Sequence, residues 1–147
     1  MKIVLDTNVL VSALLKPSSK PAAILRLIIN GQLELVFDTR ILTEYREVLQ
    51  RPRFRFMPEQ VNALLDFFEK EGLLAVGVPL PEGLADPADE PFLEAAISAH
   101  AEALVTGNKR HYPKAGYGDV RILSPSEFLD AFHFTEQDSK AAGKKFH

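Results

Sequence analysis

The feature that most constrains the fold of this chain is a short apolar run that ends abruptly at an acid. Residues 3–5 are Ile-Val-Leu, and Asp6 follows them directly. A short continuous apolar run predicts a strand that is buried on both faces, as in a parallel sheet covered by helices. Asp6 would then lie at the carboxyl end of that strand, where open α/β sheets bind ligands. Aspartate is also a good helix N-cap, so its position alone does not decide its role.

The rest of the chain alternates between strand and helix patterns. Glycine follows two of the predicted helices, at Gly31 and Gly72, and adopts the left-handed conformation that ends helices at little cost. Alternation of this kind predicts an α/β fold with a doubly wound parallel sheet. The predicted strands are 2–5, 33–37, 74–78, 103–106 and 120–123, and the predicted helices are 8–15, 21–30, 39–50, 58–71, 90–102 and 125–132.

Length and composition limit the possible functions. A chain of 147 residues suffices for one domain, and the absence of cysteine excludes disulfides, thiol nucleophiles and cysteine-bound zinc. We expect a domain over residues 1–133 and a polar tail over 134–147, where apolar residues become rare. No stretch resembles a secretory signal or a membrane span, so we expect a cytoplasmic protein. The net charge of −3 means that a nucleic-acid partner would need a local basic patch.

A second acid lies on the predicted helix 39–50. The apolar residues of this segment recur at the spacing of a core-facing stripe, and Glu44 stands three residues from Ile41 and four from Val48. The Glu44 carboxylate therefore belongs at the border of the stripe, near the edge of the domain. The alternative is an ordinary solvated or salt-bridged edge residue.

Further acids precede the predicted helix 90–102. Asp86 or Asp89 could cap that helix, but a cap explains only one of three acids within five residues, Glu90 being the third. A bound cation would relieve their mutual repulsion. The next predicted strand ends at Thr106, and Asn108 follows two residues later. Polar groups thus recur at successive strand ends, which predicts a carboxylate cluster that binds a divalent metal.

The chemistry of such a cluster is that of metal-assisted hydrolysis. Mg²⁺ and Mn²⁺ prefer oxygen ligands and keep several waters. One or two such ions can activate water and stabilise the oxygens of a phosphodiester displacement. The chain has no Gly-x-Ser-x-Gly and no P-loop pattern, so the sequence offers no evident side-chain nucleophile.

The order of these motifs resembles the PIN-domain nucleases, and above all the bacterial and archaeal group described as toxins of toxin–antitoxin systems. The resemblance spans nearly the whole chain, residues 1–132. It implies a three-layer α/β/α sandwich with a mostly parallel sheet, Mg²⁺- or Mn²⁺-dependent endoribonuclease activity on RNA, a homodimer and an inhibitory antitoxin partner. The motifs are Asp6-Thr7-Asn8-Val9, Thr43-Glu44, Asp86-Pro87-Ala88-Asp89, Val105-Thr106-Gly107-Asn108-Lys109 and Ser124-Pro125-Ser126-Glu127-Phe128-Leu129.

The resemblance also implies roles for individual residues. Asp6, Glu44 and Asp89 match the metal-binding and catalytic acids. Where many relatives have a fourth acid, this chain has Asn108, which has a carbonyl oxygen but no charge; we therefore favour one firmly bound metal, with Asp86 in a partly compensating role. The residues that match the polar supports of the acids are Thr7, Asn8 and Thr106.

Two basic segments are candidates for binding RNA. Basic side chains can position phosphates, and aromatic side chains can stack on unpaired bases. The alternative is that the charges are merely solvated and that the aromatic residues cover the core. The first segment contains Lys109, Arg110, His111 and Lys114, and the second contains Arg51, Arg53 and Arg55 in alternation with Pro52, Phe54 and Phe56. We interpret His100 as a packed helix residue, and Leu64, Leu65, Phe67 and Phe68 as core or dimer surface.

Three functions remain open at this point. The first is a metal-dependent ribonuclease of the toxin type. The second, favoured by Asn108, is a PIN-like module that binds RNA or protein with weak or no catalysis. The third is a metal-dependent phosphatase, although the chain lacks the Asp-x-Asp motif of an aspartyl-phosphate mechanism. The RNA sequence that is cleaved and the existence of an antitoxin are not encoded in any pattern of this chain.

Overall fold

A six-stranded sheet organises the molecule, with strand order β3-β2-β1-β4-β6-β5. The structure is a computed structural model and describes residues 1–132. All pairings among β1, β2, β3, β4 and β6 are parallel, and only β5 runs antiparallel to its neighbour β6. The strands are β1 Lys2–Leu5, β2 Glu34–Phe37, β3 Leu73–Leu74, β4 Ala103–Val105, β5 Gly116–Tyr117 and β6 Val120–Leu123.

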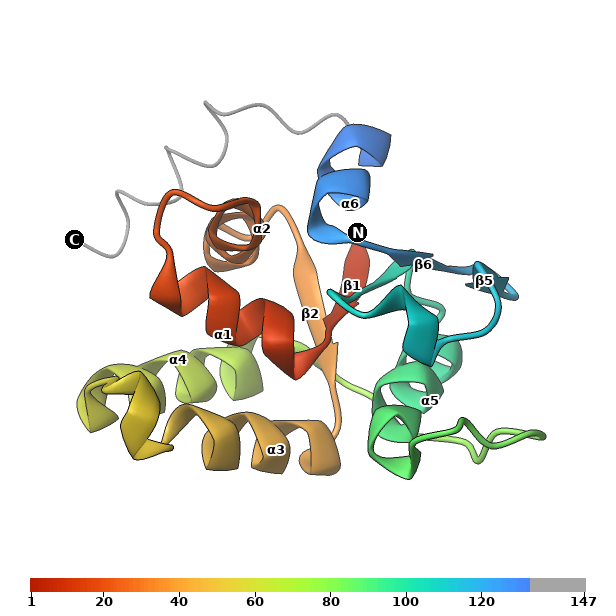
Figure 1. The fold of residues 1–147 in the computed structure, drawn as a ribbon, viewed down its shortest axis with the longest axis horizontal. Helices are drawn as coiled ribbons and strands as arrows, with labels where there is room; N and C mark the ends of the chain where they lie inside the picture. The colour runs from red at the N-terminus through yellow and green to blue at the C-terminus, as the bar shows by residue number, and fades with distance from the viewer. Residues whose placement is uncertain (133–147) are drawn as a thin grey trace.

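Helices cover both faces of this sheet. Figure 1 shows α1 and α2 on one side of β1 and β2, and α5 on the other. α1 packs along α2, α3 packs along α4, and α5 contacts β1, β2 and β4 directly. The predicted α/β/α sandwich with a mostly parallel sheet is therefore confirmed. The helices are α1 Thr7–Leu15, α2 Lys20–Ile29, α3 Thr39–Leu49, α4 Pro58–Glu71, α5 Glu90–Ser98 and α6 Pro125–Phe132, with short 3₁₀ turns η1 Pro52–Phe54, η2 Pro87–Asp89 and η3 Lys109–His111.

The two central strands form the middle of the core. Ile3, Val4 and Leu5 of β1 are fully buried, as are all three residues of β4. In the register of these strands Leu5 lies beside Val105, so both strands end at the same level. The residues that follow them, Asp6 and Thr106, consequently lie side by side at one edge of the sheet.

The predicted strand 74–78 is wrong in extent. β3 contains only Leu73 and Leu74, and the last contact with the sheet is the bond from the Ala75 amide to the Phe37 carbonyl (2.7 Å). β3 lies at the edge of the sheet, so the alternating Val76 and Val78 have no outer strand to pair with, and both side chains are exposed. The alternation that predicted a strand is real, but it has no partner among residues 1–132.

The prediction for the end of helix 90–102 is also wrong. α5 ends at Ser98, because His100 adopts a left-handed conformation with φ 53°. The His100 amide donates to the Ile97 carbonyl and the Ala101 amide to the Ala96 carbonyl, which is the Schellman pattern of a helix end. His100 is therefore not packed in a helix, and its side chain is 77% exposed. This motif usually has glycine at the left-handed position, so a histidine there did not predict the helix end.

Glycine is required at positions 31 and 72, after two of the helices, for different reasons. Gly31 has φ 86°, as the stop signal requires. Gly72 has φ −83°, and a Cβ at this position would come within 2.5 Å of the Phe68 carbonyl oxygen and 2.7 Å of the Leu35 carbonyl oxygen. Gly72 thus permits close backbone approach, not a left-handed turn.

The sequence prediction also omitted β5. Gly118, with φ 59°, forms the tight turn that pairs β5 with β6. No helix of residues 1–132 is long and apolar enough to cross a membrane. The predicted tail 134–147 lies outside the described residues.

Candidate active site

Asp6 stands where the sequence predicted, at the carboxyl end of β1, and its side chain is not a helix cap. It occupies the N-cap position of α1, yet its carboxylate makes no cap hydrogen bond with any described residue of that helix. Instead, Oδ2 accepts a hydrogen bond from the Thr106 hydroxyl (2.8 Å). Asp6 is buried. The helix-cap alternative for this carboxylate is therefore excluded.

Thr106 connects the ends of two segments. It is fully buried after β4, and its Oγ1 accepts a hydrogen bond from the Asn108 amide (3.0 Å) while the hydroxyl donates to Asp6. A hydroxyl can do both at once. The contact between Asn108 and the acid site thus runs through the Asn108 backbone.

Glu44 comes to the same edge from α3. The Asp38 carboxylate caps α3 by accepting from the Ile41 amide (2.9 Å), and the buried Tyr45 hydroxyl donates to the Leu5 carbonyl at the end of β1 (2.6 Å). These contacts fix the helix against the strand that ends at Asp6. Thr7 then donates its hydroxyl proton to Oε2 of the half-buried Glu44.

Asp89 completes the group from the start of α5. It is buried, and its Oδ2 lies 3.0 Å from Nδ1 of His111. Apart from this ion pair, Oδ2 has no polar partner within residues 1–132. Asp86, by contrast, is exposed and caps η2 by accepting from the Ala88 amide (3.0 Å). Of the acids in this segment, Asp89 is the one that turns inward.

The three carboxylates lie within electrostatic range of one another. Burial raises the pKa of each, and so does repulsion: Asp89 acts on Asp6, Asp6 on Glu44, and Glu44, together with Asp86, on Asp89. Hydrogen bonds from Thr106 and Thr7 oppose the increase in the pKa of Asp6 and Glu44, and the neighbouring His111 does so for Asp89. The fold thus gathers negative charge at a poorly hydrated edge.

The donor set suits a hard divalent ion by its chemistry. All three groups are carboxylates, and the buried Asp89 Oδ2 has an unused acceptor site. Within the described part of the chain, however, no three His, Asp or Glu side chains stand close enough to bind one ion directly. Mg²⁺ and Mn²⁺ keep several waters in protein sites, so some of these carboxylates can act through water. On those terms the residues fit such an ion.

The other predicted site residues are less closely associated with the acids. Asn8 is exposed on α1, and Arg110 is exposed within η3. The Lys109 ammonium group is bound by the Glu127 carboxylate, with both oxygens at 3.0 Å. Only His111 of this basic segment touches a site acid.

The second basic segment is partly occupied by contacts of its own. Arg53 lies over the Phe54 ring (4.8 Å), and Phe54 stacks on Phe56 (5.7 Å between centroids). Both rings pack against the core, as the alternative explanation stated. Arg51 is exposed, 3.9 Å from Glu47, and lowers the pKa of Glu44 slightly, as the smallest of several influences.

Sequence reasoning did not identify two tyrosines at the site. Tyr45 belongs to the buried stripe of α3, and its hydroxyl also links α3 to β1. Tyr112 is buried beside the site, and its pKa is raised by burial and by all three acids. No periodic pattern or motif marked Tyr112, because it follows η3 in an irregular segment.

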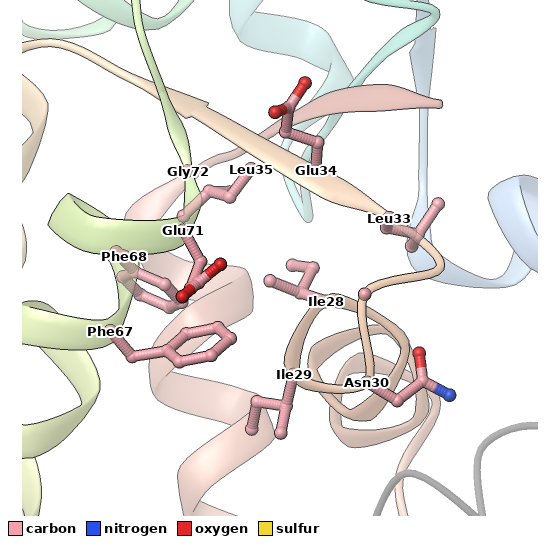
Figure 2. A pocket seen from close by; sticks show the side chains of 11 residues that line it. Ile28, Ile29, Asn30, Leu33, Glu34, Leu35, Phe67, Phe68, Glu71 and Gly72 are labelled. Carbon is pink, nitrogen blue, oxygen red and sulfur yellow. The ribbon is translucent and has the colours of Figure 1, made fainter.

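Three cavities among residues 1–132 are lined by residues other than Asp6, Glu44 and Asp89. One of about 370 Å³ is lined by residues from the end of α2, the start of β2 and the end of α4 (Figure 2). Its position at the amino end of β2 separates it from the acids. Phe67 and Phe68 both line it, and Leu65 and Phe68 are buried in the core, which is one of the two roles predicted for them.

Three comparisons bear on this arrangement. The family model described as PIN domain matches residues 2–110. An uncharacterized protein of Methanocaldococcus jannaschii is 26% identical over 143 residues, covering 90% of this chain and 92% of the relative. The fold is similar to that of VapBC2 from Rickettsia felis, whose crystal structure contains a DNA fragment from its promoter. That similarity has a TM-score of 0.51 and 19% identity, and covers 83% of this chain and 97% of the solved one.

Proposed function

This chain belongs to the PIN domain family, whose members are typically nucleases, and we propose that it is a Mg²⁺- or Mn²⁺-dependent endoribonuclease. The observation that supports the proposal most is the convergence of Asp6, Glu44 and Asp89. These acids come from three separate segments, all are at least half-buried, and each raises the pKa of another. A purely structural role would not require three like charges at one edge.

In this proposal the three acids bind the ion, and neighbouring side chains hold the acids in position. A divalent ion bound here would lower the pKa of a water molecule and neutralise charge on the scissile phosphate. Thr106 and Thr7 orient the carboxylates of Asp6 and Glu44 through their hydroxyls. Asp89 adds a third carboxylate, which His111 holds from the solvent side.

The rim around the acids would bind the RNA backbone. His111 contacts Asp89, Arg110 precedes it in η3, and both side chains are exposed and could position phosphates. Lys109 contributes less, since Glu127 already neutralises it. Arg51 and Arg53 follow α3, the helix of Glu44, and would contact RNA further along the strand.

We further propose that the enzyme is the toxin of a toxin–antitoxin pair and acts as a homodimer in the cytoplasm. The fold similarity to VapBC2, which is a complex bound to promoter DNA, supports an antitoxin partner for this chain. A gene for a small partner protein next to that of this chain would be the corresponding genetic observation.

The test is RNA cleavage by Asp6→Asn in the presence of Mn²⁺. The substitution keeps the size of the side chain and an acceptor for Thr106 but removes the charge. We expect cleavage to fall by at least about 100-fold. The matched control is Asp66→Asn, which makes the same change at an exposed position of α4 and should cleave like the wild type. Undiminished cleavage by folded Asp6→Asn would reject the proposal.

A second candidate function is a module that binds RNA or protein without turnover. Two observations favour it: Asn108 stands where a fourth acid is expected, and no ready-made three-ligand set exists within residues 1–132. If this function is correct, the wild type binds RNA or protein equally well with and without a chelator and does not cleave RNA. If the ribonuclease function is correct, the wild type cleaves RNA, and cleavage stops when EDTA removes the ion.

A further inference from the structure

Tyr112 lies at the end of a segment that touches the acid site twice. The segment begins at Thr106, which binds Asp6, and His111 of η3 contacts Asp89. Tyr112 follows η3 directly, and its amide donates to the Lys109 carbonyl (3.0 Å), which closes that turn. The backbone of Tyr112 is therefore held in place beside two of the three acids.

The Tyr112 hydroxyl is buried without a partner. The residue is 3% exposed, and its oxygen forms no hydrogen bond to any atom of residues 1–132. Burying a hydroxyl without a hydrogen bond is unfavourable, so phenylalanine would suit the ring position better if packing were its only task.

The surroundings of this hydroxyl are rich in acceptors. Asp6, Asp89 and Glu44 all act electrostatically on it, in that order, and they favour its protonated form, which can donate a hydrogen bond. Oδ2 of Asp89 is likewise buried and without a hydrogen bond to the described residues. A buried donor and a buried acceptor near the same acids, not bonded to each other, suit a small polar ligand that bonds to both.

We infer that Tyr112 is a positioning residue of the acid site, whose hydroxyl donates a hydrogen bond to an oxygen held among the carboxylates. That oxygen belongs either to the hydration shell of a divalent ion or to a phosphate of the RNA. The inference rests on the proposed function, since both sources of oxygen come from it. Unlike the hydroxyls of Thr7 and Thr106, which already bind carboxylates, the Tyr112 hydroxyl is available to a ligand.

The experiment compares Tyr112→Phe with Tyr117→Phe, a half-buried tyrosine whose oxygen accepts from the Lys114 amide (3.3 Å). For each protein, the melting temperature is measured in EDTA and during a Mn²⁺ titration without RNA, followed by kcat and KM on RNA. We expect Tyr112→Phe to melt at or above the wild-type temperature in EDTA. If the oxygen belongs to the hydration shell of the ion, the Kd of Tyr112→Phe for Mn²⁺ should be about 10-fold or more above that of the wild type. If the oxygen belongs to a phosphate of the RNA, Tyr112→Phe should bind Mn²⁺ like the wild type. Its KM for RNA should then rise about 10-fold or more.

A measurement on the unaltered protein accompanies the variants. With ¹³Cζ-labelled tyrosine, the Tyr112 resonance should shift on addition of Mg²⁺ or of an uncleaved RNA analogue, and the Tyr117 resonance should not. A lower melting temperature of Tyr112→Phe in EDTA, with Kd, KM and the Tyr112 resonance unaffected by ligand, would show a structural role and overturn the inference.

The same data separate this inference from the proposed function. Asp6→Asn is titrated with Mn²⁺ beside the other variants. If the wild type binds the ion, Asp6→Asn does not, and Tyr112→Phe matches the wild type in Kd and KM, only the inference about Tyr112 fails. If the wild type neither binds Mn²⁺ nor cleaves RNA, both fail together.

Discussion

At the scale of single residues, the acids of this site are held mainly by neutral hydroxyls and not by opposite charges. Thr106 binds Asp6 and Thr7 binds Glu44, and of the three acids Asp89 is the one that forms an ion pair with a basic side chain of residues 1–132, His111. Hydroxyls orient carboxylates but leave their charge in place. The negative charge therefore remains available to a cation, and the fold is less stable for it.

This arrangement predicts how stability depends on pH when a chelator is present. Burial and Asp89 raise the pKa of Asp6 in the folded state. Below the ordinary carboxylate range both folded and unfolded chains hold the proton, and ionisation costs nothing. As the pH rises from about 4 through the raised pKa, the unfolded chain releases its proton first, so the free energy of unfolding falls.

Asp6→Asn should remove this decrease in the free energy of unfolding at higher pH. In EDTA at pH 7 we expect its melting temperature to exceed that of the wild type by about 2–4 °C, which corresponds to about 1 kcal/mol for a chain of this size. The difference should disappear near pH 3.5. Calorimetry across this pH range is the measurement, with Asp66→Asn as the control. A lower melting temperature for Asp6→Asn at pH 7 would contradict the electrostatic account.

At the scale of elements, one hydrogen bond joins α3 to the strand that ends at Asp6. The Tyr45 hydroxyl donates to the Leu5 carbonyl, and Tyr45 adjoins Glu44 in the chain. Tyr45→Phe keeps the ring, which contacts Phe68 and Phe92, but leaves a buried carbonyl without this donor. We expect a loss of about 1–3 kcal/mol in the free energy of unfolding, and weaker Mn²⁺ binding because Glu44 is less firmly positioned. Urea denaturation measures the first effect; unchanged stability would mean that α3 is held by apolar packing alone.

The start of α6 responds to pH in the opposite direction. Ser124 and Glu127 form a capping box: the Glu127 amide donates to the Ser124 hydroxyl oxygen (3.1 Å) and the Ser124 amide to the Glu127 carboxylate (2.9 Å). The bond from the Ser124 amide, assisted by Lys109, lowers the pKa of Glu127 to about 2. This contribution to stability is complete above the ordinary pKa of glutamate, 4.5, and is lost as the pH falls toward 2.

Glu127→Gln tests this effect. The wild type should be more stable than the variant at pH 6, and the difference should shrink between pH 4.5 and pH 2. Direct titration of Glu127 by NMR gives the pKa itself. An ordinary value near 4.5 would show that the capping box does not form in solution.

At the scale of the whole molecule, strand order explains why the acids meet where they do. From β1 the chain crosses to β2 on one side, and later returns to β4 on the other side. Strand connections that diverge in this way leave a crevice at the carboxyl ends of the strands. Asp6 and Thr106 are the first residues beyond those ends, so the topology brings their side chains together.

The extent of the domain is testable at this scale. Within residues 1–132 the last fully buried residue is Phe128, and its ring contacts Phe132 (4.9 Å between centroids). We propose that residues 1–133 fold as one unit. A chain ending at residue 133 should unfold cooperatively within about 2 °C of the full chain and bind Mn²⁺ equally well. A decrease of about 5 °C or more would show that residues 134–147 belong to the domain.

The predictions that succeeded rest on short-range patterns. The apolar runs of β1 and β4 predicted buried strands, and the stripe of α3 placed Glu44 at its border. The predictions that failed concern segments whose structure depends on contacts with another part of the chain. The alternation after Leu74 lacks a second strand, and His100 adopts a left-handed conformation because bonds at the end of α5 require it.

The residues alone determined most of the elements, the α/β class and the position of Asp6 after a strand, because hydrophobic periodicity and strand–helix alternation are local properties of a chain. The tertiary structure decided which acid turns inward, which basic groups are already neutralised and which tyrosines face the site. Asp89 rather than Asp86 joins Asp6 and Glu44, Glu127 pairs with Lys109, and Tyr112 lies beside the acids. These outcomes depend on side chains far apart in sequence, whose distances are set only when the sheet and its helices have packed.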